Sequence, residues 1–221
     1  MIYGRPVVDA EPAGVLACLD ELLRRPQAPS ERAASGGSVM PWVARIVAGT
    51  AACASLYGAA SGFFQGGSQV LYAGLKAPVI LLASAALCLP SLYVFALLAG
   101  AALTASRFVV VLLSYLGLLA LVLVGLLPIE WLFSVSSQSL TFVVWLHLVL
   151  WVLALGFGWR FLRAALPEVP FGALVLWVGL FCVVSFQVAT FVRPVLLRNE
   201  GVPLVEPGKL FFLDHFNNVV D

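Results

Sequence analysis

His147 is the residue whose chemical type and position most favour a specific role in this sequence of 221 residues. It lies inside an apolar stretch, where an ionisable side chain is costly unless it is paired, so a functional role is the default hypothesis. Its imidazole could ligate a haem or chlorin, take part in a proton relay, or hydrogen-bond a neighbouring helix. We favour the hydrogen bond, with Gln187 of another apolar stretch as partner, because single polar residues often join helices in membrane bundles.

The two chemical alternatives for His147 lack the companions that they usually need. A haem held between two histidines requires a second intramembrane imidazole, whereas His215 lies in the carboxyl-terminal tail. A proton relay uses a chain of Asp, Glu or His side chains, and we assign no Asp or Glu to the apolar spans. We therefore predict no bound cofactor, with His147 as the one position where a single-ligand pigment could bind.

The cysteines and the short motifs do not indicate an enzyme. Cys18, Cys53, Cys88 and Cys182 lie in separate segments without CxxC or Cys/His spacing, so neither a zinc site nor a disulfide framework is indicated. The sequence has no Ser-His-Asp grouping, no phosphate loop and no HExxH motif. We predict that the protein is not an enzyme and has no metal site.

A second candidate site is a small polar cavity around Pro90, Ser91, Tyr93 and Gln187. Pro90 lies in the middle of an apolar stretch, so it should kink a helix and free a backbone carbonyl that neighbouring helices or Ser hydroxyls can satisfy. Ser91 and Tyr93 would line the cavity beside this kink. The alternative is that they hydrogen-bond to their own helix, which is the usual arrangement in membranes.

The composition predicts the elements that position these residues. The chain is 62% hydrophobic and 10% charged, against about 25% charged residues in soluble domains, and an apolar helix of about 20 residues spans a bilayer core. We predict an all-α integral membrane bundle of five helices over residues 39–193, at about 42–64, 77–99, 108–127, 140–159 and 172–192. The net charge is +1 with scattered basic residues, which does not favour nucleic acid as a partner.

Residue size suggests how these helices pack. The first span is rich in Gly and Ala, and Gly58 and Gly62 lie four residues apart, which lets another helix backbone approach closely. We expect packing within the chain before a homo-oligomer. The third span is rich in Leu and Val, so we expect it to face lipid and to end at Pro128, with Glu130 and Trp131 at the membrane edge.

Residues 1–38 are expected to be a cytoplasmic segment with an amphipathic helix at 9–26 and a flexible linker at 27–37. The helix carries an apolar stripe that includes Leu16, Leu19 and Leu23. It could rest on the membrane surface or on the protein's own loops, which we favour, or these leucines could contact a partner. Residues 194–221 form a tail that we expect to lie at the membrane interface.

The basic residues predict the orientation. Seven basic residues fall on the side of the amino terminus, with Arg107, Arg160 and Arg163 in short connections. The other side has four, which are Lys76 and the tail residues Arg193, Arg198 and Lys209. Because short cytoplasmic loops are enriched in Lys and Arg, the amino terminus is expected in the cytoplasm.

Two stretches carry a resemblance to known proteins. The segment from Gly74 to Gly100, and the ending with Phe191-Val-Arg-Pro, Lys209-Leu-Phe-Phe and Phe216-Asn-Asn, resemble an uncharacterised group of small bacterial polytopic membrane proteins. The five-span layout with a cytoplasmic amino-terminal segment is similar to the Yip1-type fold of membrane-trafficking proteins. The resemblance implies a multi-pass protein of a bacterial inner membrane, and it implies no site residues.

These observations lead to three functional predictions. The first is a non-enzymatic integral membrane subunit or scaffold that packs in the lipid bilayer with other membrane protein subunits, or as a homo-oligomer. The second is a permease-like or channel-like transport component with a cavity near Pro90. The third is a pigment-, haem- or quinone-associated subunit of an energy-converting complex, centred on His147.

Overall fold

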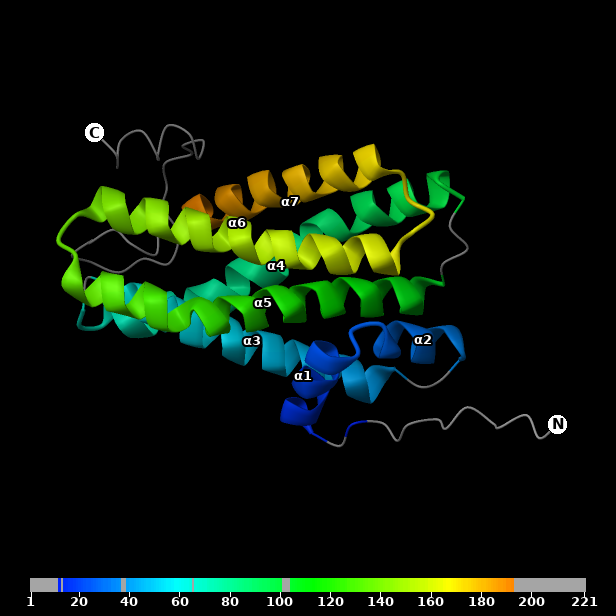
Figure 1. Cartoon of the computed structure of the whole chain (residues 1–221), viewed down its shortest axis with the longest axis horizontal. Helices are drawn as coiled ribbons and strands as arrows, with labels where there is room; N and C mark the ends of the chain where they lie inside the picture. The colour runs from blue at the N-terminus through cyan, green and yellow to red at the C-terminus, as the bar shows by residue number, and fades with distance from the viewer. Residues whose placement is uncertain (1–11, 13, 37–38, 65, 101–103, 193–221) are drawn as a thin grey trace.

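The computed structural model describes residues 12, 14–36, 39–64, 66–100 and 104–192, and these residues fold into helices without strands (Figure 1). Two short helices, α1 (Val15–Arg24) and α2 (Ala28–Ala34), precede the long ones. The long helices are α3 (Met40–Gly62), α4 (Gln69–Leu98), α5 (Ala105–Ser136), α6 (Leu140–Ala165) and α7 (Phe171–Phe191). All five are long and apolar enough to cross a membrane. The predictions of an all-α fold and of five potential spans are thus confirmed for the described residues.

The five long helices lie side by side and alternate in direction, so that α3, α5 and α7 begin at the end where α2 lies (Figure 1). Helix α3 packs against α4 and α5, α5 packs against α6, and α4 packs against α7. Aromatic rings fill the interior between α5 and α7. Tyr115 on α5 makes edge contacts with Trp177 and Phe181 on α7, with ring centroids 5.8 and 6.1 Å apart.

The prediction that the third span faces lipid and ends at Pro128 is wrong. Helix α5 runs through Pro128 to Ser136, and 56% of its most apolar window is buried, the largest share among the five long helices. Proline is tolerated inside membrane helices because neighbouring groups can satisfy the freed carbonyl. Leu and Val side chains pack as well against protein as against lipid, so their abundance did not distinguish the two environments.

Residues 27–37 were expected to form a flexible linker, and the structure corrects this in part. They contain α2, which has Pro29 and Glu31 in its first turn. Proline fixes φ at a value suited to a helix start, and an acidic side chain interacts favourably with the positive end of the helix dipole. Pro29, Ser30 and Ala33 are buried, and α2 packs against α5.

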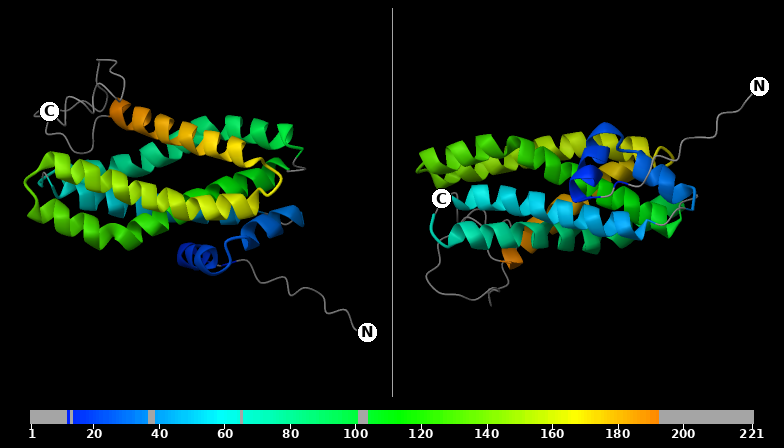
Figure 2. Two further views of the ribbon diagram at one scale, coloured as in Figure 1. Left: turned by 45° about the horizontal axis from the view of Figure 1, so that its top comes forward. Right: turned by 90° about the horizontal axis from the view of Figure 1, so that it is seen from below.

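Helix α1 covers part of the predicted helix 9–26, whose first residues lie outside the described part of the chain. Its buried face packs across α3 and α5. Val15 and Leu19 approach Gly49 of α3, and Leu22 lies over Gly117 of α5. In the view from below the bundle, α1 runs across the long helices rather than along them (Figure 2).

Gly58 and Gly62 lie where α3 meets α4. A Cβ atom added to Gly58 would come within 2.6 Å of the backbone oxygen of Ala73, and one added to Gly62 would come within 2.8 Å of Val70 Cα. Only residues without a Cβ fit so close to a neighbouring backbone. The structure places both glycines in contacts within the chain.

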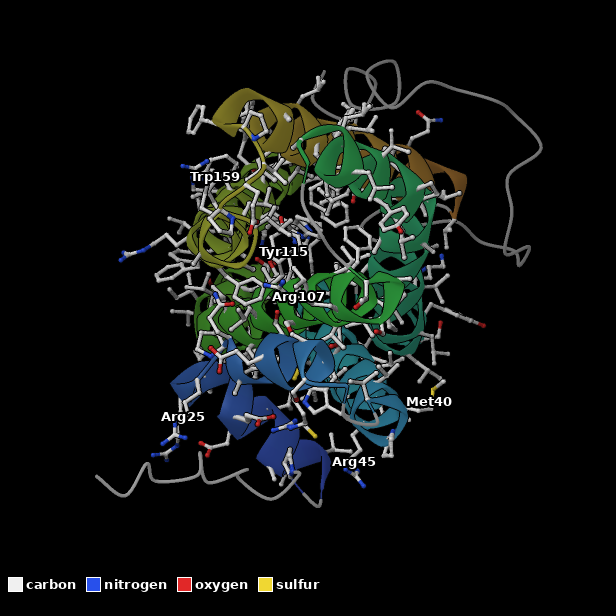
Figure 3. All side chains as sticks on the ribbon, turned by 90° about the vertical axis from the view of Figure 1, so that its right-hand side faces the viewer. Arg25, Met40, Arg45, Arg107, Tyr115 and Trp159 are labelled. Atoms are coloured by element: carbon white, nitrogen blue, oxygen red, sulfur yellow. The ribbon has the colours of Figure 1, made fainter. Side chains whose placement is uncertain are left out.

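Arginines gather at the end of the bundle where α2 lies. Figure 3 looks along the bundle from this end, where Arg25 and Arg45 point outward and Arg107 lies near the centre. The guanidinium of Arg45 donates a hydrogen bond to the carbonyl oxygen of Pro12 at 2.8 Å, and that of Arg107 donates one to Ser30 Oγ at 3.3 Å. These bonds fix the segment of α1 and α2 to the long helices.

Candidate functional site

Glu130 is the fully buried carboxylate of the described residues, and it lies on α5 two residues after Pro128. Its Oε1 atom is 3.4 Å from Nδ1 of His147 on α6. Its Oε2 atom has no hydrogen-bond partner in the described part of the chain. The prediction that the spans hold no Asp or Glu is therefore wrong, because the helix that was expected to end at Pro128 continues past Glu130.

His147 connects this carboxylate to a third helix. Its Nδ1 atom also lies 3.2 Å from the hydroxyl oxygen of Tyr57 on α3, and the two rings stack with centroids 5.4 Å apart. Tyr57 is buried, whereas 27% of the His147 side chain is exposed. One imidazole thus touches a buried acid and a buried phenol while part of its ring reaches the bundle surface.

The short connection between α5 and α6 brings Glu130 and His147 together. Ser139 caps α6 by accepting a hydrogen bond from the Phe142 amide at 3.3 Å, and Phe133 packs edge-on against Phe142 with centroids 5.4 Å apart. In an antiparallel pair, residues equally distant from the connection face one another. Glu130 and His147 are each about two helical turns from it.

Ser134 adds another unpaired polar atom near Glu130 on α5, where the Tyr115 hydroxyl is also without a partner among the described residues. Ser134 lies one turn beyond Glu130, is buried, and its Oγ has no hydrogen-bond partner in the described region. Two other buried serines donate to their own helices: Ser84 Oγ to the Ile80 carbonyl at 2.7 Å, and Ser114 Oγ to the Val110 carbonyl at 2.8 Å, whereas Ser185 Oγ on α7 has no partner among the described residues. Buried polar atoms without a partner are rare and point to a bound water or ion, or to a functional role.

The burial of Glu130 has an electrostatic cost that His147 can offset. An unpaired carboxylate buried among apolar helices costs several kcal/mol. Glu130 avoids this cost when it shares one proton with His147, either as a carboxylate beside an imidazolium or as a carboxylic acid beside a neutral imidazole. The imidazolium would donate through Nδ1–H to Glu130, and the neutral ring could accept from Glu130 or Tyr57. The contact with His147 therefore offsets part of the cost of burying Glu130.

The other predicted site residues lie away from this cluster. Ser91 Oγ donates to the Cys88 carbonyl of its own helix at 2.8 Å, and the buried indole of Trp177 on α7 donates to the same carbonyl at 3.0 Å. Tyr93 packs edge-on against Phe108 of α5 at 5.2 Å, and Pro90 is exposed. Of the two alternatives for Ser91, the structure has the hydrogen bond to its own helix.

The pairing of His147 with Gln187 stays a prediction. Gln187 is partly buried on α7, whereas Nδ1 of His147 faces Tyr57 and Glu130. Two signals in the sequence could have indicated the observed pairing. Apolar residues continue from Ile129 to Phe133 after Pro128, and an acid that interrupts such a stretch is a functional candidate by default.

No group of three or more His, Cys, Asp or Glu side chains within the described ranges could hold a metal ion. Comparison of the chain with known protein families, with curated proteins and with solved structures finds no match. The resemblances to small bacterial membrane proteins and to the Yip1-type layout therefore stay predictions.

Proposed function

We propose that the protein is a multi-pass membrane protein of the transport class in which Glu130 and His147 bind and release a proton at one side of the membrane. One observation carries this proposal: a fully buried carboxylate lies 3.4 Å from an imidazole that reaches the bundle surface. An acid and a histidine inside membrane helices are typical of proton-binding sites. This pair supplies the exchangeable proton and its route to the surface.

The direction of proton access follows from the arginines. Arg107, near the start of α5, and Arg160 and Arg163, near the end of α6, lie at the bundle end opposite to Glu130. Because cytoplasmic loops are enriched in Lys and Arg, this end would face the cytoplasm. Glu130 and His147 would then sense the proton concentration on the non-cytoplasmic side.

Proton binding would act on the packing of α6. Among the described residues, Tyr57 of α3 is the titratable side chain that contacts the pair formed by Glu130 of α5 and His147 of α6. With one shared proton the pair is neutral overall. A second proton leaves an imidazolium beside a neutral acid, and a net charge in this position favours movement of His147 toward the surface. Proton uptake would thus loosen α6 from α3 and α5.

Infrared difference spectroscopy of the reconstituted protein tests this proposal directly. A change of external pH should produce a carbonyl band of a protonated carboxylic acid, and the band should be absent from Glu130→Gln. Glu168→Gln is the matched control, because Glu168 is an exposed carboxylate in the connection between α6 and α7. The control should keep the band. A wild-type protein with no such band, or a band that persists in Glu130→Gln, would refute the proposal.

The other two classes predicted from the sequence have their own tests. A membrane subunit or scaffold should co-purify with other chains, which mass spectrometry of a sample extracted in mild detergent would identify. A pigment- or haem-associated subunit should absorb visible light, with a spectrum that changes in His147→Ala.

A further inference from the structure

Two leucines on α1 remain exposed although the same helix buries its other large apolar side chains. Leu16 is 82% exposed and Leu23 is 61% exposed, whereas Leu19 and Leu22 are buried against the bundle. Leu16 and Leu23 are seven residues apart, which puts them on the same side of the helix. The chain thus presents a short apolar strip that its own long helices do not cover.

Glu21 shows which way this strip faces. Its Oε1 atom accepts a hydrogen bond from the guanidinium of Arg32 on α2, and its Oε2 atom accepts one from Trp42 Nε1 at 3.2 Å. Helix α2 lies beyond α1 toward the arginine-rich end of the bundle (Figure 1). The flank of α1 that carries Glu21 therefore faces that end.

The leucines occupy the opposite flank. At 3.6 residues per turn, Leu23 lies about 160° and Leu16 about 140° from Glu21 in the same sense around the helix. Because α1 runs across the bundle (Figure 2), one of its flanks faces the arginine-rich end and the other faces the middle of the long helices. Leu16 and Leu23 hence point along the bundle toward the region whose outer surface is apolar, where Leu56 of α3 is one of the exposed large side chains.

Asp20 and Arg24 lie on the side of α1 that faces away from the bundle. Arg24 Nε donates to both carboxylate oxygens of Asp20 at 2.8 Å, and this hydrogen bond raises the pKa of Arg24. Both side chains are exposed. Helix α1 therefore has three sides: one packed on α3 and α5, one apolar and open, and one charged and open. A helix with adjacent apolar and charged sides is suited to the boundary between lipid and water.

We propose that α1 lies in the membrane interface, with Leu16 and Leu23 inserted among the lipid acyl chains that surround the long helices. The exposed charged side chains of Asp20 and Arg24 then face the aqueous phase. Leu16 and Leu23 point toward the apolar outer surface of the long helices. The lipid that would surround this surface would therefore also cover the two leucines. The inference depends on the spans crossing a membrane and is independent of proton binding by Glu130.

Photocrosslinking in lipid nanodiscs tests this inference on the full-length chain. A benzophenone amino acid is placed at Leu16, Leu23 or Ala17, one position per variant, and irradiation is followed by mass spectrometry for phospholipid adducts. Ala17 is the matched control, because it is exposed next to Leu16 but lies about 40° from Glu21 on the charged flank. A fourth variant at the exposed Leu56 of α3 reports whether the spans themselves contact lipid.

We expect several-fold more lipid adduct at Leu16 and Leu23 than at Ala17, in variants that elute as wild type from a sizing column. Equal yields at Leu16, Leu23 and Ala17, or adducts at Leu56 alone, would overturn the proposal for α1. Adducts between protein chains at Leu16 or Leu23, in place of lipid adducts, would also overturn it and would identify the strip as a protein contact. Loss of adducts at Leu56 as well would contradict membrane insertion itself, while infrared data on Glu130 test proton binding separately.

Discussion

Oε1 of Glu130 and Nδ1 of His147 lie 3.4 Å apart inside the bundle. Each side chain offsets the cost of burying the other one. Glu130 has no exposed surface, so water cannot replace His147 as its partner without a structural change. The contact between the two side chains therefore contributes to the stability of the fold.

Removal of one member of this pair should cost more than removal of both. We expect His147→Ala to destabilise the protein by about 2–5 kcal/mol, because Glu130 is left buried without its partner. The double variant Glu130→Gln/His147→Ala should recover part of this loss. Thermal unfolding in detergent of the wild type, both single variants and the double variant gives the coupling energy. Additive effects of the two changes would show that the residues do not interact.

A methyl group at Gly58 should separate α3 from α4. In Gly58→Ala the new Cβ meets the backbone oxygen of Ala73 at 2.6 Å and Ala77 Cβ at 2.5 Å, and neither atom is the end of a flexible side chain. We expect a loss of about 1–3 kcal/mol. Gly125→Ala on α5 is the control, because no neighbouring atom lies within 4 Å of the position that its new methyl group would take. It should be neutral or slightly stabilising. Equal thermal shifts in the two variants would contradict the close approach of α3 and α4.

The indole of Trp177 joins α7 to α4. Trp177→Phe keeps most of the ring but removes the hydrogen bond to the Cys88 carbonyl, which should cost about 1 kcal/mol. Trp131→Phe is the matched change on α5, where the indole is exposed, and it should have little effect. Chemical denaturation followed by circular dichroism would compare the two. A larger loss of stability in Trp131→Phe than in Trp177→Phe would contradict a stabilising role of the Trp177 hydrogen bond.

Leu22→Ala should release α1 more than it unfolds the long helices. Leu22 is fully buried, and truncation of such a leucine costs about 2–5 kcal/mol. Because the contact of Leu22 with Gly117 holds only α1, we expect faster hydrogen exchange in residues 15–24 and little change in α4 and α7. Ala17→Ser, at an exposed position outside the apolar strip, is the control. Unchanged exchange in α1 of Leu22→Ala would contradict the prediction.

The sequence predicted the number and type of the long helices because each span is an uninterrupted apolar stretch of sufficient length. The predicted end of the third span at Pro128 was wrong. Proline often ends a helix, but it is tolerated inside membrane helices, and α5 continues past it. This single boundary removed Glu130 from the predicted spans and led us to discount a proton site at His147. The contact of Tyr57 with His147 could not be predicted either, since pairing between α3 and α6 depends on the order in which helices pack, which hydrophobicity does not encode.

The sequence also did not predict which side chains of α1 are buried. The apolar stripe predicted that Leu19 and Leu23 would both contact another surface. In the structure Leu19 is buried and Leu23 is exposed. The difference arises because α1 crosses two helices that offer small residues at Gly49 and Gly117. Glycines so distant in sequence carry no signal that they form one surface.

The packing of Leu22 against Gly117 determines when α1 can dock during synthesis of the chain. A methyl group at Gly117 would lie 2.8 Å from Leu22 Cδ1, so α1 completes its packing only on a segment that is translated much later. At about 5–20 residues per second, the ribosome needs roughly 5–20 s to reach residue 117 after residue 22. During that interval α3 and α4 are already complete, whereas Leu22 lacks its contact on α5. The docking of α1 on α5 can therefore be completed only after most of the chain before residue 117 has been made.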